Sequence, residues 1–526
     1  MSKVSALEVR ELTEMPEVIA CFEALRSGPY PWLLDSGGSP GAPSTEIARY
    51  SFMGSDPYLV LRSRGKENEI ECLRDVFAGD VLADALGDDA RVFEPGVQHV
   101  SGDPLEIMRS LLPPVPDLAE LKAHFSRVPP FLTGAVGYLG YELAESCEPV
   151  QLTSRDDFGL PDLVLLFVDR LLVIDHVAQR SYAVGLGIAD ASDVGAARGR
   201  AVLAAESIAD LARASLRNGA SSAAGSEVDW LQRRQLLDSP LPEGAKAHFD
   251  AEGYAAAVEE IREEIAAGNV YQANLTQRID LPSANLADQG CDADIGWRLY
   301  RALRQLSPAP FAAYLELPEV TVASSSPERF VSLDRAGRAE SRPIKGTRRR
   351  GASSTEDMLL AKELEGSQKD RAENLMIVDL VRNDLGRVCE TGTVVVPELM
   401  TIEQYATVFQ MVSTVRGTLR SDCDAADLVR ATFPPGSMTG APKIAAMKII
   451  DRIEPVRRGI YSGAIGYFDA AGGLDLSVVI RTLLVRNGHI HLHSGGAVVI
   501  DSDPMGEYRE SLDKIRALLA AAACGE

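Results

Sequence analysis

The chain has 526 residues, of which 46% are hydrophobic and 25% are charged. This balance is ordinary for soluble globular proteins, and it excludes collagen-like, largely disordered and multi-span membrane chains. The formal net charge of −23 argues against a nucleic-acid partner, because binding phosphates requires a basic surface.

Signals for export, membrane insertion and disulfide formation are missing from the sequence. The charged N-terminus lacks the apolar core of an export signal. The longest apolar stretch, Leu163 to Ile174, is broken by Asp169 and Arg170 and is too short to cross a bilayer. The seven cysteines are singletons without a CxxC pair, which disfavours structural zinc. We therefore expect a reduced, cytoplasmic protein that does not bind membranes.

The first part of the chain, residues 1–177, is predicted to be an N-terminal subdomain of short strands and turns. Residues 37–44 and 113–116 are rich in Gly and Pro and predict loops. Residues 131–141 are rich in glycine and aromatics, and residues 163–174 predict a buried strand pair or one bent strand.

The composition then changes to Ala, Ser, Gly and Arg, and we interpret residues 178–248 as an insert or linker. Within this segment, Ala196 to Leu216 predicts a helix, and residues 217–226 predict a flexible linker.

The third part, residues 249–526, is predicted to be the catalytic region. Its strands and helices alternate without a βαβ rhythm or an internal repeat, which favours an α+β fold. The expected strands are 270–281, 311–317, 394–399, 465–468, 474–485 and 489–492. The expected helices are 252–267, capped by Asp250, and 356–364, 370–385, 425–431, 443–453 and 505–522.

Two carboxylate pairs lie on predicted helices. Asp370 and Glu373 are three residues apart, as are Glu507 and Glu510, and residues at this spacing share a helix face. Two such faces brought together would offer the oxygen ligands that Mg²⁺ prefers. Spacing alone favours the plainer interpretation, a solvated acidic face, for either pair.

A lysine and a glutamate are candidate catalytic residues. Lys345 lies in the segment PIKGTRRRG between a proline and a glycine turn, and repulsion from the adjacent arginines would lower its pKa and leave a nucleophilic amine. From this segment alone a solvated basic turn is the favoured interpretation. Glu328, in SPERF, could act as a general acid if it is desolvated, or could simply pair with Arg329.

Two glycine-rich loops and a histidine-rich strand complete the candidates. The loop 434–443 (PPGSMTGAPK) opens a predicted helix and favours anions, but its spacing is not that of a nucleotide-binding loop. Residues 494–497 form a second loop of this kind. His489, His491 and His493 alternate, and we interpret them as a partly exposed edge strand rather than a metal site.

These segments, in this order, resemble the chorismate-binding enzymes, a family of anthranilate synthase large subunits, isochorismate and salicylate synthases and aminodeoxychorismate synthase component I. The resemblance covers residues 18 to 520, with 178–244 as the weak stretch. It implies two large antiparallel β-sheets packed as a sandwich with helices outside. The matching segments are YQANLTQR at Tyr271, SSPERF at Ser325, PIKGT at Pro343, AENLMIVDLVRNDLGR at Ala372, PPGSMTGAPK at Pro434, YSGAIGYF at Tyr461, DLSVVIRT at Asp475 and DSDPMGEYRESLDK at Asp501.

The resemblance also implies roles for individual residues. Glu373 and Glu510 would coordinate Mg²⁺, and Asp370 and Glu507 would reach the ion through water. Glu328 would protonate the ring hydroxyl that departs. The substrate-binding residues would be Tyr461 and Arg481, gripping the enolpyruvyl carboxylate, with Ser437, Gly440, Gly463, Gly495 and Lys514 lining the rest of the pocket.

Position 345 distinguishes the subclasses, because anthranilate synthases resemble this chain here but have alanine. The lysine implies amination of chorismate to 4-amino-4-deoxychorismate, with Lys345 attacking C2 of the ring and ammonia then adding at C4. No cysteine lies in a GxCxG nucleophile elbow, so a separate glutamine amidotransferase would supply the ammonia. The alternatives are anthranilate or isochorismate formation, and a non-enzymatic subunit that binds chorismate.

Three positions depart from the family pattern, and two further segments bear on a tryptophan pocket. Gln410 stands just before Met411-Val412-Ser413, where many relatives have histidine, which disfavours pyruvate elimination to an aromatic product. Asp370 replaces a usual glutamate, and Ala497 a common glycine. Leu34, Asp35 and Ser36 resemble part of the tryptophan pocket of anthranilate synthases, but Pro310-Phe311-Ala312 lacks the usual partner sequence.

Overall fold

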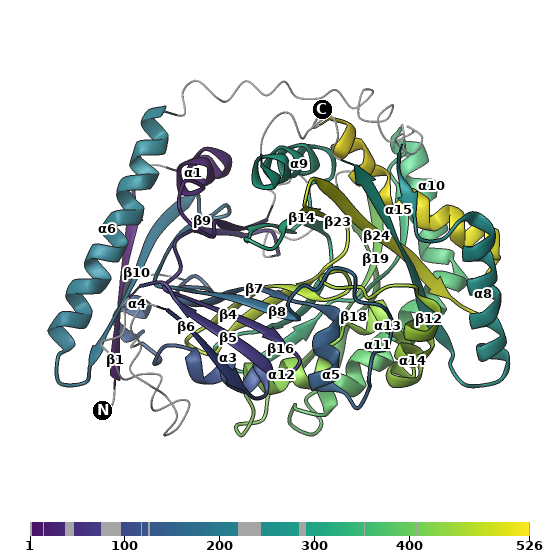
Figure 1. The fold of residues 1–526 in the computed structure, drawn as a ribbon, viewed down its shortest axis with the longest axis horizontal. Helices are drawn as coiled ribbons and strands as arrows, with labels where there is room; N and C mark the ends of the chain where they lie inside the picture. Colours follow the sequence, from purple (N-terminus) through teal and green to yellow (C-terminus); the bar gives the residue numbers. More distant parts are fainter. Residues whose placement is uncertain are drawn as a thin grey trace.

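Two antiparallel β-sheets of twelve strands each form the frame of the protein in this computed structural model (Figure 1). Among the described residues no helix is both long and apolar enough to cross a membrane. The structure describes residues 3–13, 15–36, 47–74, 96–116, 118–124, 127–218, 244–282, 291–351, 353–405 and 408–524.

The first sheet combines strands from both ends of the chain. Its order is β1-β10-β9-β3-β2-β13-β14-β23-β24-β12-β11, and β20 pairs with β12. The strands are β1 (Lys3–Leu12), β2 (Trp32–Asp35), β3 (Tyr50–Gly54), β9 (Arg170–Asp175), β10 (Arg180–Asp190), β11 (Lys246–Ala247), β12 (Gln272–Pro282), β13 (Phe311–Glu316), β14 (Thr321–Ser326), β20 (Gly440–Ala441), β23 (Thr482–Arg486) and β24 (His489–Val498).

The second sheet also combines strands from the early and late parts of the chain. Its order is β17-β19-β16-β15-β22-β21-β7-β8-β4-β5-β6, and β18 pairs with β19. The strands are β4 (Leu59–Arg64), β5 (Glu67–Cys72), β6 (Gly96–Ser101), β7 (Gly134–Leu139), β8 (Leu163–Val168), β15 (Arg329–Leu333), β16 (Arg338–Ser341), β17 (Ile344–Arg349), β18 (Val395–Gln404), β19 (Val408–Thr418), β21 (Ala464–Asp469) and β22 (Leu474–Val478).

Apolar side chains from both sheets meet in a shared core. Phe52 and Leu315 of the first sheet pack in one cluster with Val136 and Tyr467 of the second. Alternation along antiparallel strands sends every other side chain inward, so the opposite faces need a cover of helices. The predicted α+β sandwich with outer helices is confirmed.

The covering helices lie on the outer faces. Figure 1 shows α1, α9 and α15 along the upper side and α3, α5 and α12 along the lower side. The helical segments are α1 (Val18–Leu25), α3 (Pro104–Leu111), α4 (Ala119–His124), the 3₁₀ turn η2 (Tyr141–Leu143), α5 (Ala144–Cys147), α6 (Val194–Asn218), α8 (Ala251–Ala266), α9 (Asp292–Leu306), α10 (Ser354–Gly366), α11 (Gln368–Gly386), α12 (Ala425–Thr432), α13 (Gly436–Thr439), α14 (Lys443–Ile453) and α15 (Pro504–Cys524).

The three segments expected from composition share strands of the same β-sheet. Residues 180–190, expected in an insert or linker, form β10, which pairs with β1 and β9 inside the first sheet. The Ala-rich helix was predicted correctly as α6. Residues 37–44 and 219–226 of the predicted loop and linker lie outside the described residues. The division of the chain into three domains stays a prediction.

One predicted strand is in fact two. Residues 474–485 divide into β22 of the second sheet and β23 of the first, and the chain crosses between the sheets at residues 479–481. Both halves are rich in buried apolar side chains, so the sequence pattern is continuous although the pairing is not. Arg481, at the end of this crossing, has a positive φ of 52°.

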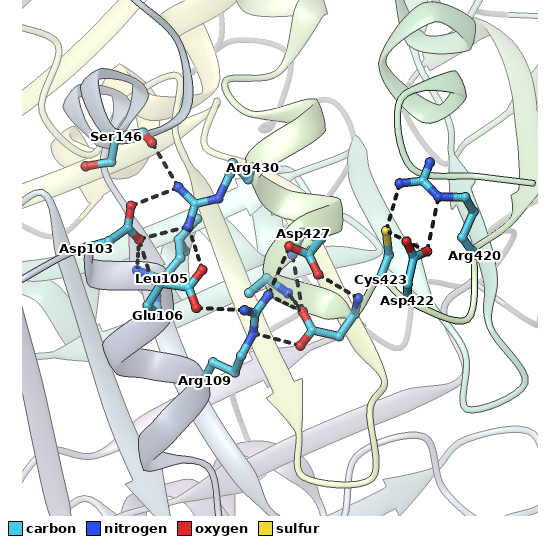
Figure 2. Close-up of polar contacts among 12 residues, drawn as sticks. Asp103, Leu105, Glu106, Arg109, Ser146, Arg420, Asp422, Cys423, Asp427 and Arg430 are labelled. Carbon is cyan, nitrogen blue, oxygen red and sulfur yellow. Dashed lines mark hydrogen bonds and ion pairs between the residues drawn. The ribbon is translucent and has the colours of Figure 1, made fainter. Parts of the chain in front are cut away.

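Figure 2 shows a charged contact between α3 and α12, which lie far apart in the sequence. The Asp103 carboxylate caps α3 by accepting from the backbone N–H of Leu105, and it also accepts from Arg430 of α12 at 2.8 and 2.9 Å. Arg109 pairs with Asp424 at 2.7 Å. These ion pairs fasten the N-terminal part of the chain to a helix of the predicted catalytic region.

Candidate active site

A cavity of about 840 Å³ opens beside the ends of β12, β17 and β24. Helices α11 and α15 form its charged wall, and the turns before α14 and β21 form its floor. Ten of the predicted site residues line it: Glu328, Lys345, Asp370, Glu373, Ser437, Tyr461, Arg481, Gly495, Glu510 and Lys514.

Lys345 reaches this cavity through a bulge in an edge strand. The pairing of β17 with β19 shifts between Ile344 and Thr347, and Gly346 there has a φ of 83°. A glycine with positive φ is what a bulge of this kind requires, so the PIKGT sequence turns the lysine out of the regular strand. Among the residues that the structure describes, the Lys345 ammonium has no ion-pair partner within 4.0 Å.

Burial lowers the pKa of Lys345, and the Lys514 ammonium adds to that effect, while the carboxylates of Glu373 and Glu328 oppose it. The direction agrees with the prediction, but the predicted cause was wrong. Arg348 is paired with Asp370 at 3.0 Å, and Arg350 with Asp357. The neighbouring arginines are therefore occupied by carboxylates, and they are not the groups that favour a neutral amine at Lys345.

Glu328 lies in the same cavity, directly before β15. Its side chain is buried, and burial raises its pKa to about 7. Hydrogen bonds from the Ser437 hydroxyl and the Ile344 backbone N–H, together with the charge of Lys345, limit that rise. A carboxyl group with a pKa near neutrality can hold a proton and release it, which is what a general acid needs.

Tyr461 and Arg481 form a polar end of the cavity. Burial lowers the pKa of the Arg481 guanidinium, and among the described residues no carboxylate pairs with it. Its positive φ of 52° is a strained conformation for arginine, of the kind that concentrates at functional sites. A half-buried cation that has no counter-ion among the described residues favours an anionic ligand.

The four predicted metal-binding carboxylates lie on facing helices, but they do not form a ready-made cage. Lys369 bridges the helices at 3.9 Å from Glu373 and 3.4 Å from Glu507. Lys514 pairs with Glu510 at 2.8 Å. Within the described ranges, no three His, Cys, Asp or Glu side chains are grouped closely enough to hold an ion.

The chemistry of these donors nevertheless suits a hard cation. A Cβ built on Gly496 would lie 3.0 Å from Oε2 of Glu507 and 3.9 Å from Oε1 of Glu510, so both carboxylates converge over a bare backbone. Burial raises the pKa of Glu373, and the charge of Glu510 contributes to that rise. A divalent cation would relieve this repulsion if it displaced the lysine ammonium groups.

Comparison with known proteins identifies the family of the chain. A family model described as chorismate binding enzyme matches residues 91–520. The chain belongs to the chorismate-binding enzyme family. Aminodeoxychorismate synthase of Streptomyces griseus is 42% identical over 95% of this chain, and the match spans 62% of that relative's length. Aminodeoxychorismate synthase component 1 of Bacillus subtilis is 35% identical over 92% of this chain and 91% of its own length. The crystal structure of anthranilate synthase component I from Streptococcus pneumoniae superposes with a TM-score of 0.67 at 27% identity, covering 90% of this chain and 92% of that one.

Three of the residues predicted to bind substrate or metal, Gly440, Gly463 and Glu507, do not line this cavity. A Cβ on Gly440 would meet the Gln272 carbonyl oxygen at 2.2 Å, and one on Gly463 would meet the Leu139 carbonyl oxygen at 2.0 Å. These glycines allow neighbouring backbones to approach closely. Glu507 is buried beside the cavity, where it accepts a 2.7 Å hydrogen bond from Ser502.

His493 is a cavity residue that sequence reasoning missed. Its ring stacks on Tyr461 with centroids 4.9 Å apart, and its buried Nε2 has no hydrogen-bond partner in the part of the chain that the structure describes. The histidine alternation was taken as an edge strand, but β24 pairs with both β12 and β23. His489 is exposed and His491 binds Asp280, so only His493 of the three histidines faces the cavity. The alternation in the sequence does not show which of the three points inward.

Gln410 occupies the cavity wall where many family members have histidine. Gln410 is buried, and its Oε1 has no hydrogen-bond partner among the described residues. Phe409, the preceding residue, turns instead to the apolar cluster with Leu364 and Met411. An amide does not remove a proton from carbon as an imidazole can, so this wall lacks the base expected for aromatisation.

The residues that resemble a tryptophan pocket lie at a second cavity. Leu34 and Asp35 line this space of about 860 Å³ between the two sheets. The Asp35 carboxylate accepts from Arg304 at 2.6 Å and from Tyr300 at 3.0 Å. Ser36 is buried and binds Ser51. Binding of tryptophan here stays a prediction.

Proposed function

We propose that this chain converts chorismate and ammonia to 4-amino-4-deoxychorismate and water. The observation that carries the proposal is one cavity in which an unpaired lysine, Lys345, faces a carboxyl group, Glu328, whose pKa lies near 7. The names of the relatives from Streptomyces griseus and Bacillus subtilis support the same reaction.

In the first step the neutral amine of Lys345 attacks ring carbon C2. The electron pair of the ring double bond shifts, the C4–O bond breaks, and Glu328 donates a proton so that the hydroxyl leaves as water. The new C2–N bond leaves a charged nitrogen, which loses one proton. Splitting the displacement in this way replaces one difficult step by two easier ones.

In the second step ammonia adds at C4, the double bond shifts back, and the C2–N bond breaks. The departing Lys345 nitrogen takes up one proton while the new amine at C4 loses one, so the amine of the enzyme is restored. Arg481 and Tyr461 hold the enolpyruvyl carboxylate throughout, because the Arg481 cation has no protein carboxylate to compete for it among the described residues.

The proposal includes Mg²⁺, a partner and a place in metabolism. Glu373 and Glu510 would hold the ion, which when bound would neutralise carboxylate charge on the substrate. A glutamine amidotransferase would supply ammonia, in keeping with the component 1 name of the Bacillus subtilis relative. The product would serve p-aminobenzoate and folate synthesis in the cytoplasm.

The test is product identification with purified protein, chorismate, Mg²⁺ and ammonium at alkaline pH, by mass and ultraviolet spectrum. Aminodeoxychorismate supports the proposal, and its loss with EDTA supports the cation. Anthranilate with pyruvate, or isochorismate, would contradict it and leave only the family assignment. Chorismate binding without any product would favour the non-enzymatic alternative.

A further inference from the structure

Arg458 lies under the floor of the cavity, with only 2% of its surface exposed. It precedes the turn that carries Tyr461. Each of its five N–H donors has an acceptor, and the five distances run from 2.7 to 3.3 Å. Burying a guanidinium costs desolvation free energy even when every donor is satisfied, so the groups that Arg458 joins indicate its role.

Three of these acceptors belong to three different walls of the cavity. One is the carbonyl oxygen of Met438, next to Ser437, at 2.7 Å. Another is the carbonyl oxygen of Asn274 in β12, also at 2.7 Å. The third is the hydroxyl of Ser462, next to Tyr461, at 3.3 Å. One rigid planar group thus sets the spacing of three chain segments that are remote in sequence.

Glu454 balances the charge of Arg458 and extends the network. It accepts two hydrogen bonds from the guanidinium, at 2.7 and 2.8 Å. It also accepts from the backbone N–H and the hydroxyl of Thr276 in β12, at 2.8 and 2.9 Å. A buried pair with every bond satisfied holds its neighbours in one arrangement.

Two residues of the N-terminal part of the chain, Tyr141 and Glu142, also contact Arg458. The Arg458 guanidinium lies 4.8 Å from the centroid of the Tyr141 ring. The Glu142 carboxyl accepts from the backbone N–H groups of Arg458 and Gly459. Burial raises the pKa of Glu142 to about 8, so at neutral pH it is mainly uncharged and Glu454 supplies the counter-charge.

We infer that Arg458 is a positioning residue of the active site, which fixes Tyr461, Ser437 and β12 relative to one another. Ser437 lowers the pKa of the Glu328 carboxyl, so the segments that carry the substrate grip and a neighbour of the general acid both contact this one group. A misplacement of about 1 Å in such a frame costs on the order of 100-fold in rate. The kinetic consequence rests on the proposed function; the binding consequence does not.

The experiment compares Arg458→Lys with Arg278→Lys. Arg278 is a matched control on β12, the strand whose Asn274 carbonyl Arg458 binds: it is buried, binds Asp157 and Asp280 through its guanidinium, and does not line the cavity. Lysine keeps the charge but loses the fork in both variants. Circular dichroism is used first to choose a temperature at which both variants are folded.

At that temperature we expect Arg458→Lys to raise KM for chorismate at least tenfold and to lower kcat/KM about 100-fold, while Arg278→Lys stays within threefold of the parent. Calorimetric binding of chorismate should weaken at least tenfold in Arg458→Lys alone. Equal kinetics and equal chorismate affinity in the two variants would overturn the inference. If the parent binds chorismate but forms no product, the proposed function fails, and the affinity comparison still decides the role of Arg458.

Ser462→Ala serves if Arg458→Lys does not fold. It removes a single 3.3 Å hydrogen bond and leaves the ion pair intact. We expect KM for chorismate to rise about threefold with little change in melting temperature. An unchanged KM in this folded variant would overturn the inference as well.

Discussion

Two cavities lined by described residues have nearly equal volumes, about 840 and 860 Å³, and they differ in how their charges are paired. In the second cavity Arg329 pairs with Asp475, and Arg416 with Glu340, so these two cations are neutralised. In the first, no carboxylate of the described residues lies within 4.0 Å of the Lys345 ammonium or the Arg481 guanidinium.

This difference favours the first cavity as the reaction site. A buried charge or polar atom without a partner is costly, and it persists where a ligand supplies the missing interaction. Among the described residues, Gln410 and His493 add unpartnered polar atoms to the first cavity, and Tyr50 adds one to the second. The comparison therefore predicts that changes at the first cavity affect chemistry, while changes to paired residues at the second leave it almost intact.

The largest effect is expected from Lys345→Ala. Removing the proposed nucleophile should lower the rate of aminodeoxychorismate formation by at least about 1,000-fold, because the proposed covalent step would be lost. The rate is measured with ammonium as nitrogen source, and the exposed Lys362→Ala on α10 serves as control. A rate within tenfold of the parent would contradict the role of Lys345.

Glu328→Gln should lower kcat about 100-fold, since glutamine cannot donate the proton to the leaving hydroxyl. In the parent, Glu328 must be protonated to act, and its pKa is about 7, so this contribution falls as the pH rises through 7. A pH–rate profile should show that the dependence disappears in Glu328→Gln. Glu398→Gln at the second cavity is the control, and a profile unchanged in Glu328→Gln would count against a general acid here.

Arg481→Lys should raise KM for chorismate by roughly 10- to 100-fold and change kcat less. Lysine keeps the charge but loses the bidentate geometry that suits a carboxylate. Steady-state kinetics with chorismate as the varied substrate give the two constants separately. If KM stays at the parental value, the assignment of Arg481 to the substrate carboxylate is wrong.

The smallest effect is expected from Arg416→Met at the second cavity. Its ion pair with Glu340 is at 2.6 Å, but 53% of the arginine side chain is exposed, so the pair stabilises by about 0–1 kcal/mol. We expect kcat/KM within twofold of the parent and a small change in melting temperature. A large loss of turnover would contradict the claim that paired residues at the second cavity do not affect catalysis.

Much of the fold and most of the site could be predicted from sequence, because long segments with strong periodicity and many family-like motifs agree in order. The helices now seen as α8, α11, α14 and α15 were expected within a few residues. The Asp250 cap was also predicted, and its carboxylate accepts from the Gly253 backbone N–H at 2.7 Å.

What sequence could not show depends on long-range contacts. The break between β22 and β23 is invisible in a continuous apolar pattern, and residues 180–190 form a buried strand although their composition suggested a linker. The pKa of Lys345 is lowered by burial and by Lys514, which lies 169 positions further along the chain (345 to 514). The stacking of His493 on Tyr461 likewise appears only when β24 meets the turn before β21.

The most direct test of the central claim is to trap the enzyme with chorismate in the absence of ammonia and measure the intact mass and the modified peptide. The account predicts a population of enzyme heavier by the mass of chorismate less one water, with the added mass on Lys345 and absent from Lys345→Ala. Unmodified enzyme throughout, together with normal product formation by Lys345→Ala, would contradict it.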